Sequence, residues 1–375
     1  MDAASLIADA FWRSDAPVAM AAAGTAAPDL AQAPGLICFQ TSGSTAAPKW
    51  IGHTRGGLLR SAQVVNAHLA VEASSCWGLL LPLHHVGGFG VAARARQAGC
   101  RLAVFDARWN AAAAAAWLER ERVTHTSMVP TQVFDLVSAG VCAPGTLVAV
   151  VVGGGHLPLE LGSKARELGW PVLASYGMTE AASQIATQGL DALDRIYQPS
   201  PLPVLPHWRL QVDGEGVLSL AGESLFAGQL VQQGAVWVYQ PREASCWRSS
   251  DRVELQDNLL TPLGRADLQV KVLGELVDLE AIERQLVELA AGQLAGNDLI
   301  VVALPDERSG HRLLPVFDAA CDPALVADVL AAHAAAAPGY TRLSAPMFLA
   351  DFPRSPLGKP VRRECAAQCR VRSGK

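Results

Sequence analysis

The sequence GLICFQTSGSTAAPK, which runs from Gly35 to Lys49, is the stretch around which the rest of the chain is interpreted. Its residues up to Gln40 are mostly apolar and predict a buried strand. Thr41 to Thr45 then gather small hydroxyl side chains around a glycine, and Pro48 and Lys49 close the loop. Such a loop can direct backbone N–H groups, hydroxyls and a lysine toward one point, which is what a polyphosphate ligand requires. The spacing is not that of the Walker loop, and a solvated Ser/Thr-rich turn is the alternative interpretation.

Length and composition restrict the class of protein. A chain of 375 residues can bury a substantial core and is long enough for more than one domain. Half of the residues are hydrophobic and the net charge is −5, so no basic surface points to nucleic acid. No apolar run approaches the roughly 20 residues that a membrane-spanning helix needs. The first residues carry acids where a signal peptide would carry Lys or Arg. We therefore expect a soluble cytoplasmic protein that binds neither nucleic acid nor membrane.

The eight cysteines are scattered along the chain, and only Cys365 and Cys369 lie close together. Zinc sites and disulfide frameworks need tighter clusters, with histidines or further cysteine pairs nearby. Reduced thiols are therefore expected, as is usual inside cells.

Strands and helices are predicted to alternate from Gly35 to Ser175, which is typical of an α/β fold with a mostly parallel sheet. Ligands of such sheets bind beyond the carboxyl ends of the strands. Polar segments follow several of the predicted strands, so we expect them to converge at one edge: Thr41 to Thr45, His84 to Gly88, Gly153 to Gly155 and Tyr176 to Glu180. The predicted strands are 35–40, 77–83, 101–105, 124–129, 147–152 and 172–175, and the predicted helices are 58–69, 89–98, 109–122, 131–138 and 158–168.

The pattern changes near Pro199. Short alternating strands separated by Gly/Asp turns predict an antiparallel β subdomain, with strands at 209–212, 217–220, 236–239 and 251–260. Beyond Arg265 a smaller unit of mixed α and β structure is expected, with strands at 269–273 and 299–304 and helices at 279–291 and 323–335. It ends in a loop rich in Pro, Gly, Lys and Arg, from Phe352 to Arg363.

Four motifs occur in a fixed order: TSGSTAAPK, then SYGMTE from Ser175, then SDRVEL with GRAD at Arg265, and finally PRSPLGK ending at Lys359. This ordered set resembles the adenylate-forming enzymes, the superfamily of acyl-CoA synthetases, peptide-synthetase adenylation domains and luciferase. Further stretches, LPLHHVGGFG, VVVGGGHLPLEL, YGMTEAASQ and GHRLLPV, are most similar to the o-succinylbenzoate–CoA ligases of menaquinone biosynthesis. The resemblance implies an AMP-binding domain over 1–266 and a small mobile lid domain of α+β structure over 267–375.

The resemblance also implies the reaction and its cofactors. A carboxylate attacks the α-phosphate of ATP, with Mg²⁺ present, to give an acyl-adenylate and pyrophosphate. The lid then rotates, and the thiol of CoA attacks the adenylate. The protein's task in such chemistry is to hold two anions together and to stabilise charge on the phosphoryl group.

Residues that match the family's nucleotide motifs take their roles from the resemblance. Thr179, Glu180 and Lys359 are predicted to be catalytic, with Thr179 at the α-phosphate, Glu180 as the carboxylate that holds Mg²⁺, and Lys359 reaching in from the lid. Taken singly, each would be an ordinary polar residue; the order of the motifs gives them their roles. Asp267 matches the hinge. The loop over the β and γ phosphates is matched by Thr41, Ser42, Gly43, Ser44, Thr45 and Lys49. The two segments that enclose adenine are matched by Gly153, Gly154, Gly155 and by Ser175, Tyr176, Gly177. Asp251 matches the carboxylate that binds the ribose hydroxyls, with Arg265 nearby, and Gly274 lies where the lid borders the path of CoA.

The acyl side is predicted from three further matches. His85 matches a catalytic histidine at the floor of the acyl pocket, and Ser183 follows the subfamily's pattern. Arg94 falls where these enzymes carry an arginine for the second carboxylate of the substrate, which a guanidinium binds in a bidentate manner. The alternative is that Arg94 pairs with an acid on the helix face, with Arg96 pointing outward. His84 is expected to be structural or exposed.

Two departures from the family pattern affect the prediction. Ala46 stands where the family usually has glycine. Alanine disfavours a positive φ at this position, which puts the adenylation rate in doubt. The segment before the loop is also short, so we expect a reduced N-terminal subdomain whose exposed sheet face could form a homodimer. Two other functions stay open: another aryl- or acyl-CoA ligase, and a protein that binds nucleotide or acyl-adenylate without turnover.

Overall fold

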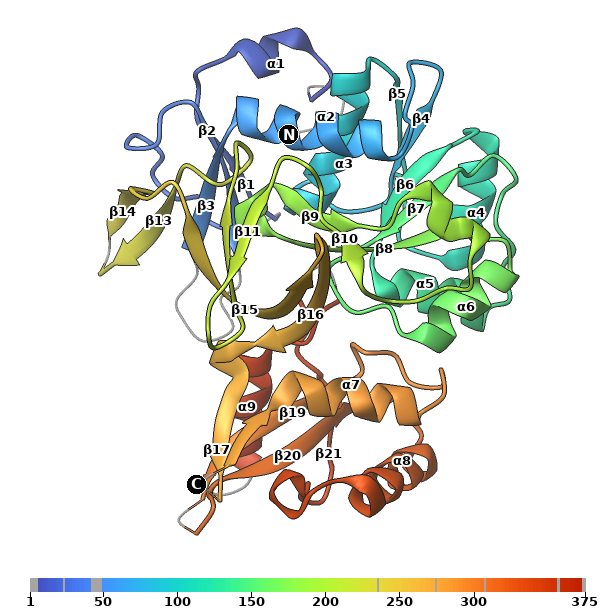
Figure 1. The fold of residues 1–375 in the computed structure, drawn as a ribbon, viewed down its shortest axis with the longest axis vertical. Coiled ribbons are helices and arrows are strands. Elements are labelled where there is room, and N and C mark those ends of the chain that lie inside the picture. The colour runs from blue at the N-terminus through green and yellow to red at the C-terminus, as the bar shows by residue number, and fades with distance from the viewer. Residues whose placement is uncertain are drawn as a thin grey trace. The chain divides into compact units, whose positions relative to one another are not determined.

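The computed structural model describes residues 6–22, 24–41, 49–234, 236–273, 275–306, 308–355 and 358–372. Its internal contacts divide the chain into two compact units (Figure 1). The first unit comprises Met1–Asp213, Leu218–Ser249 and Leu255–Thr261, and the second comprises Gly214–Val217, Ser250–Glu254 and Pro262–Lys375.

A six-stranded sheet in the order β5-β4-β6-β7-β8-β9 forms the centre of the first unit. Its first five strands are parallel, and β9 runs antiparallel to β8. Parallel strands need crossovers, and helices supply them. The predicted parallel sheet is thereby confirmed. The elements are β4 (Cys76–Leu79), α3 (Val86–Ala98), β5 (Arg101–Val104), α4 (Ala111–Arg120), β6 (His125–Met128), α5 (Pro130–Ser138), β7 (Ala149–Val152), α6 (Leu159–Glu167), β8 (Val172–Met178), η1 (Thr179–Ala181) and β9 (Ser183–Thr187).

The strand before the Ser/Thr loop belongs to a different sheet, ordered β1-β2-β3-β13-β14. Strand β2 (Leu36–Thr41) pairs antiparallel with β3 (Lys49–Thr54), and Thr41 is opposite Lys49. The prediction that this segment lies at the edge of the parallel sheet was therefore wrong, because the chain returns directly as a hairpin strand instead of crossing over through a helix. The remaining elements are α1 (Asp9–Arg13), β1 (Val18–Met20), α2 (Arg55–His68), β13 (Gly228–Gln233) and β14 (Val236–Pro241).

A third sheet, ordered β10-β16-β15-β12-β11, corresponds to the predicted β subdomain. Its pairs β10–β16 and β11–β12 are antiparallel. The single strand predicted at 251–260 is in fact two strands, since Asp257 and Asn258 both take positive φ and form a tight turn. The bounds are η2 (Leu190–Asp194), β10 (Leu202–Pro203), β11 (Arg209–Val212), β12 (Val217–Ala221), β15 (Trp247–Gln256) and β16 (Leu259–Arg265).

The second unit contains the sheet β19-β20-β21 and the hairpin β17-β18. One core lies between this sheet and helices α7 and α8, and another core includes Cys365 and Cys369 of α9. Those two cysteines are fully buried, one helical turn apart, and serve as core residues. All eight cysteines are free thiols, as predicted. The elements are η3 (Ala266–Leu268), β17 (Gln269–Val272), β18 (Glu275–Asp278), α7 (Leu279–Leu289), β19 (Leu299–Asp306), β20 (Gly310–Asp318), α8 (Pro323–Ala336), η4 (Gly339–Thr341), β21 (Met347–Leu349) and α9 (Arg362–Arg372).

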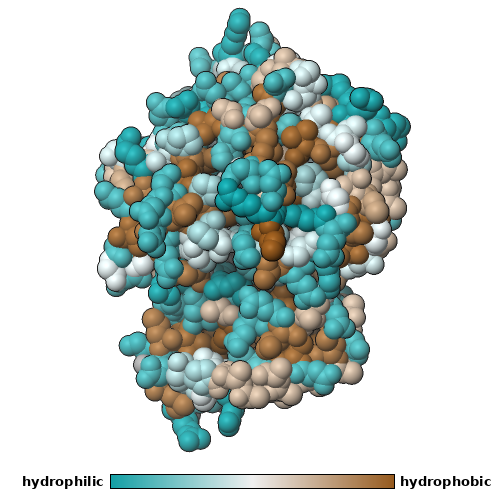
Figure 2. All heavy atoms as spheres, turned by 45° about the vertical axis from the view of Figure 1, so that its right-hand side comes forward, coloured by the Kyte–Doolittle hydropathy of each residue, from teal (hydrophilic) through white to brown (hydrophobic). Residues whose placement is uncertain are grey.

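Figure 2 shows hydrophilic and hydrophobic residues mixed over one face of the molecule. The exposed large hydrophobic residues include Ile196, Val236 in β14 and Val371 in α9, and two others, Leu273 and Leu276, lie close in sequence beside and within β18. Single exposed apolar residues are usual on folded proteins. Within the described ranges, no helix is both long and apolar enough to cross a membrane.

Candidate functional site

An ion pair joins the hairpin to the end of the parallel sheet. Lys49 begins β3, Glu180 lies in the short helix η1, and Lys49 Nζ is 3.5 Å from Glu180 Oε1. The side chains are 33% and 14% exposed, so a ligand can still reach the pair. Although β3 and β8 belong to different sheets, the first residue of β3 and the short helix after β8 therefore meet.

A buried histidine of β3, His53, contacts the backbone of Thr179. His53 Nε2 lies 2.7 Å from the carbonyl oxygen of Thr179, and the imidazole is fully buried. Burial lowers the pKa of His53 to about 4, against the opposing effect of this hydrogen bond. The ring is therefore neutral near pH 7, and Nε2–H donates to the carbonyl. Sequence reasoning missed His53; the only signal was a histidine within the otherwise apolar segment WIGH.

The segment Ser175–Gly177 is part of strand β8, which continues to Met178 instead of ending at Ser175 as predicted. The pairing with β9 shifts register between Tyr176 and Gly177. A Cβ atom on Gly177 would lie 1.6 Å from the carbonyl oxygen of Ser183, so only glycine fits there. The close contact with β9 therefore restricts the backbone position of Ser175–Gly177.

The glycine segment after β7 lies against Ser175. A Cβ atom on Gly153 would be 3.7 Å from the carbonyl oxygen of Ser175, and Gly154 takes a φ of +77°. The hydroxyl of Ser175 in turn bonds Thr187 Oγ1 at 2.8 Å. The structure thus brings together one glycine and one serine from the two segments predicted to enclose adenine.

Arg94 is buried in α3, with only 2% of its surface exposed. Its Nη1 donates to Ser127 Oγ at 3.2 Å, and its Cζ lies 5.2 Å from the ring centroid of Trp77. A Cβ atom on Gly90 would be 3.2 Å from Arg94 Nη2 and 3.8 Å from Ser183 Cβ, so the guanidinium and Ser183 lie on the same side of the helix. Among the described residues no carboxylate forms an ion pair with Arg94.

The electrostatics of Arg94 follow from that arrangement. Burial lowers the pKa of Arg94 to about 9, because the charged guanidinium has lost water and gained no negative partner. Arg96, two residues along α3, instead forms an ion pair with Asp9 and is partly exposed. Among the described residues, Arg94 therefore does not pair with a protein acid, contrary to the alternative interpretation.

The two adjacent histidines lie at the start of α3. His85 is the N-cap residue of this helix, and its ring centroid is 4.3 Å from that of His84. Burial lowers the pKa of His84. The role of His85 at the acyl pocket stays a prediction.

In the second unit, Arg265 joins the predicted ribose carboxylate to the predicted hinge. Its Nη1 is 3.3 Å from Asp251 Oδ1, while its Nε and Nη2 lie 2.8 and 2.7 Å from the two carboxylate oxygens of Asp267. These hydrogen bonds to Asp267 raise the pKa of Arg265, and the charge of Asp251 adds to the effect. Arg265 is thus a fixed cation between two acids.

Lys359 lies in the loop before α9, in the same unit. Its backbone N–H donates to Ser355 Oγ at 3.2 Å. Desolvation lowers the pKa of Lys359, against the pull of the negative charges of Glu280 and Asp251. The second unit therefore brings Lys359 into the electrostatic neighbourhood of the predicted ribose carboxylate.

Some predicted residues lie outside the described part of the chain: Ser42, Gly43, Ser44, Thr45, the substituted Ala46, and Gly274. In the described ranges, no group of three or more His, Cys, Asp or Glu residues could hold a metal ion. A hollow of about 620 Å³ lies elsewhere, at the amino-terminal ends of β4 and β5, where Cys76 and Arg101 line it. It is at the opposite ends of the parallel strands from Gly153, so it is separate from the candidate site.

Residues 7–236 match the family described as AMP-binding enzyme. The chain belongs to this family. The matched region contains all the first-unit site residues described above, and the resemblance to adenylate-forming enzymes is confirmed.

Among curated proteins, the chain is similar to 2-succinylbenzoate–CoA ligase of Escherichia coli (strain K12), with 32% identity over 284 residues. These residues are 74% of this chain and 57% of that protein, so the chain spans little more than half of that relative's length.

Two solved structures are similar to most of the chain. A variant of E. coli MenE with bound OSB-AMS has a TM-score of 0.70 and 25% sequence identity, over 90% of this chain and 69% of that chain. MenE from Bacillus subtilis in complex with the acyl-adenylate OSB-AMP has a TM-score of 0.74 and 20% identity, over 88% and 68%. These similarities confirm the predicted α/β fold class.

Proposed function

We propose that this protein is an AMP-forming acid–thiol ligase, which makes an acyl-adenylate from a carboxylate and ATP and then an acyl-CoA thioester. We propose o-succinylbenzoate as its substrate and o-succinylbenzoyl-CoA as its product, a step of menaquinone biosynthesis. Family membership, the ordered motifs and the name of the E. coli relative support the chemistry.

The observation that carries the substrate proposal is the buried guanidinium of Arg94. A charge this deep usually has a paired carboxylate, since an unpaired buried charge is costly. The guanidinium of Arg94 instead contacts the hydroxyl of Ser127 and the indole ring of Trp77. A substrate with a second carboxylate would supply the missing anion, and a substrate with one carboxylate would not.

The β and γ phosphates of ATP are proposed to bind at the Ser/Thr loop and Lys49, and the α-phosphate at Thr179. Adenine is proposed to lie between Gly153–Gly155 and Ser175–Gly177, with Thr41 at the start of the phosphate loop. A magnesium ion bound to ATP is compatible with this arrangement. Mg²⁺ usually takes most of its ligands from water and phosphate oxygens and needs only one or two protein carboxylates. Glu180 would hold it, and the bound ion would neutralise phosphate charge. Lys49, 3.5 Å from Glu180, would add a second cation to the phosphates.

The second unit is proposed to act as the lid, in line with a division at 1–266 and 267–375. Asp251 would accept hydrogen bonds from the ribose hydroxyls, with Arg265 holding its carboxylate in place at 3.3 Å. Asp267 would be the hinge. Lys359 would contact the substrate carboxylate and the α-phosphate during adenylation, and Gly274 would border the path of CoA.

Each half-reaction exchanges one bond for another. A carboxylate oxygen of the substrate bonds to the α-phosphorus as the bond to the pyrophosphate oxygen breaks. The sulfur of CoA, having lost its proton, then bonds to the acyl carbon, and AMP leaves with the electrons of the acyl–oxygen bond. Lys359 and Thr179 would stabilise the negative charge that grows on the phosphoryl oxygens, and His85 would shape the access of acyl group and CoA.

We also propose a cytoplasmic location, which the free state of all eight thiols supports. The proposed partners are small molecules: ATP, CoA and the carboxylate. A homodimer stays a prediction of the sequence. Light scattering tests it, and a monodisperse monomer would contradict it.

The experiment that tests the function is pyrophosphate release from ATP and Mg²⁺ over a panel of carboxylates, with and without CoA. We expect release that is selective for o-succinylbenzoate, and a thioester only when CoA is added. Selectivity for another acid would keep the chemistry and replace the substrate by that of a different aryl- or acyl-CoA ligase. No release for any acid, with ATP still bound, would favour the nucleotide-binding protein without turnover.

A further inference from the structure

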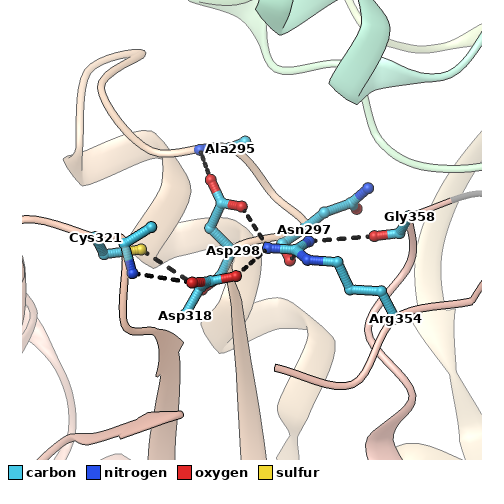
Figure 3. Close-up of polar contacts among 8 residues, drawn as sticks. Ala295, Asn297, Asp298, Asp318, Cys321, Arg354 and Gly358 are labelled. Carbon is cyan, nitrogen blue, oxygen red and sulfur yellow. Dashed lines mark hydrogen bonds and ion pairs between the residues drawn. The ribbon is translucent and has the colours of Figure 1, made fainter. Parts of the chain in front are cut away.

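Arg354 connects the segment next to Lys359 to other parts of the second unit through hydrogen bonds (Figure 3). Arg354 Nη1 donates to the carbonyl oxygens of Asn297 and Gly358, the latter at 3.2 Å. Its Nη2 donates to Asp298 Oδ1 at 2.8 Å and to Asp318 Oδ2 at 2.9 Å. The carbonyl of Gly358 belongs to the peptide bond that leads into Lys359. Arg354 therefore fixes the backbone directly before the lysine.

The two aspartates are themselves held by strands β19 and β20. Asp298 directly precedes β19 and Asp318 ends β20, and the Asp318 N–H donates to the Asp298 carbonyl at 2.9 Å. Asp318 Oδ1 also accepts the N–H of Ala320 at 2.9 Å. The guanidinium is thus attached to a rigid pair of strands, and it lies 5.0 Å from the ring centroid of the buried Phe352.

The loop closes on itself around the same point. Ser355 N–H donates to the Lys359 carbonyl at 2.7 Å, and Gly358 N–H donates to the Ser355 carbonyl at 2.8 Å. Gly358 takes a φ of +75°, a conformation that favours glycine. A planar guanidinium can serve two carbonyls and two carboxylates in fixed directions, whereas a lysine ammonium cannot.

We propose that Arg354 is a positioning residue for adenylation, which holds the Lys359 loop against Asp298 and Asp318 so that the lysine enters the site in one orientation. The inference rests on the proposed function of Lys359. The competing explanation is that Arg354 only stabilises the second unit. The two differ in their effect on the half-reactions, because only adenylation uses Lys359 while both need a folded lid.

The test measures the half-reactions separately in Arg354→Ala, Arg354→Lys, Lys359→Ala and the double variant Arg354→Ala/Lys359→Ala. For Arg354→Ala we expect kcat of adenylation to fall by about 10- to 100-fold, the cost of roughly 1 Å of misplacement, with KM for ATP little changed. Arg354→Lys should recover part of this loss. Thioester formation from supplied acyl-adenylate and CoA should stay close to wild type. The double variant should be no slower than Lys359→Ala, since residues that act through each other are not additive.

Arg370→Ala, an exposed arginine on α9, is the matched control and should leave both half-reactions unchanged. Equal losses in both half-reactions, or additive losses in the double variant, would overturn the proposal. Should Arg354→Ala fail to fold, Asp318→Asn takes its place, with a smaller loss expected in adenylation alone.

Hydrogen exchange supplies a readout that does not depend on turnover. The Gly358 and Lys359 amides should exchange faster in Arg354→Ala than in wild type, while amides in β19 and β20 keep their protection. Unchanged exchange rates at these two amides in Arg354→Ala would contradict the proposal. Wild-type protein that releases no pyrophosphate would instead count against the proposed function, and the exchange data would still decide whether Arg354 holds the loop.

Discussion

At the scale of single residues, Arg94 has a buried charge that costs stability, and the proposed dicarboxylate substrate would explain its position. Its charge is removed from water, and among the described residues its guanidinium makes one side-chain hydrogen bond, to Ser127, and contacts the face of Trp77. Neither contact supplies negative charge. Replacing buried ionic groups by apolar ones is often neutral or stabilising, so folding alone does not require an arginine at this position.

Arg94→Ala should separate substrates by their number of carboxylates. We expect kcat/KM for a dicarboxylate acid to fall by about 30-fold or more, because losing one partner of a buried charge pair costs about 2–5 kcal/mol. Activity on an aryl monocarboxylate should change by less than about threefold. Arg96→Ala is the control from the same helix, since Arg96 pairs with Asp9 at the surface. Equal losses for both classes of acid would remove Arg94 from the substrate site.

At the scale of elements, most of the parallel sheet could be predicted because apolar segments and glycine-rich turns mark its strands. Strand β3 was missed because its segment, WIGHT, has no clear alternation. Strands β15 and β16 were merged because their turn, Asp257-Asn258, contains neither Gly nor Pro. The pairing of β3 with β13 joins segments far apart in the chain, and no local pattern encodes such a partner.

The candidate site was predictable only as far as its motifs extend. Lys49, Glu180 and Arg94 were named from sequence, but the ion pair of the first two was not. His53 and Arg354 were not named at all as site residues. Each of them acts through a contact with a distant backbone carbonyl, Thr179 for His53 and Asn297 for Arg354. A contact of this kind depends on the tertiary fold and leaves no spacing pattern in the sequence.

The bulge of β8 against β9 gives a prediction at this scale. Gly177→Ala would place a methyl group 1.6 Å from the Ser183 carbonyl, so β9 would have to move. We expect a loss of about 1–3 kcal/mol in the free energy of unfolding, typical of overpacking, together with a higher KM for ATP. Gly56→Ala in α2 is the control: nothing lies within 4 Å of its added Cβ, and stability should be unchanged or slightly greater. Denaturant unfolding and ATP kinetics check both, and an unchanged Gly177→Ala would contradict the strand geometry.

At the scale of the whole molecule, the two units carry buried or half-buried titratable groups whose pKa values are shifted in opposite directions. In the first unit, burial lowers the pKa of His53 and of His207 to about 4. In the second unit, burial and the charge of Glu283 raise the pKa of Glu280 to about 7. The histidines are thus kept neutral where the unfolded chain would bind protons, and Glu280 keeps a proton that the unfolded chain would release.

These shifts predict opposite pH dependence for the two units. Between about pH 6.5 and 4 the unfolded chain protonates His53 and the folded chain does not, so the first unit loses stability as the pH falls. For the fully buried His53 the loss is about 3 kcal/mol over that window. Between about pH 4.5 and 7 the folded chain keeps a proton on Glu280 that the unfolded chain releases, so the second unit loses stability as the pH rises. Hydrogen exchange followed separately in each unit from pH 4.5 to 7.5 measures both trends. His53→Gln should weaken the trend of the first unit alone, with His207 contributing to what remains, and Glu280→Gln should weaken that of the second alone. Parallel trends in the two units, or a single variant that flattens both, would show that other groups control the response to pH.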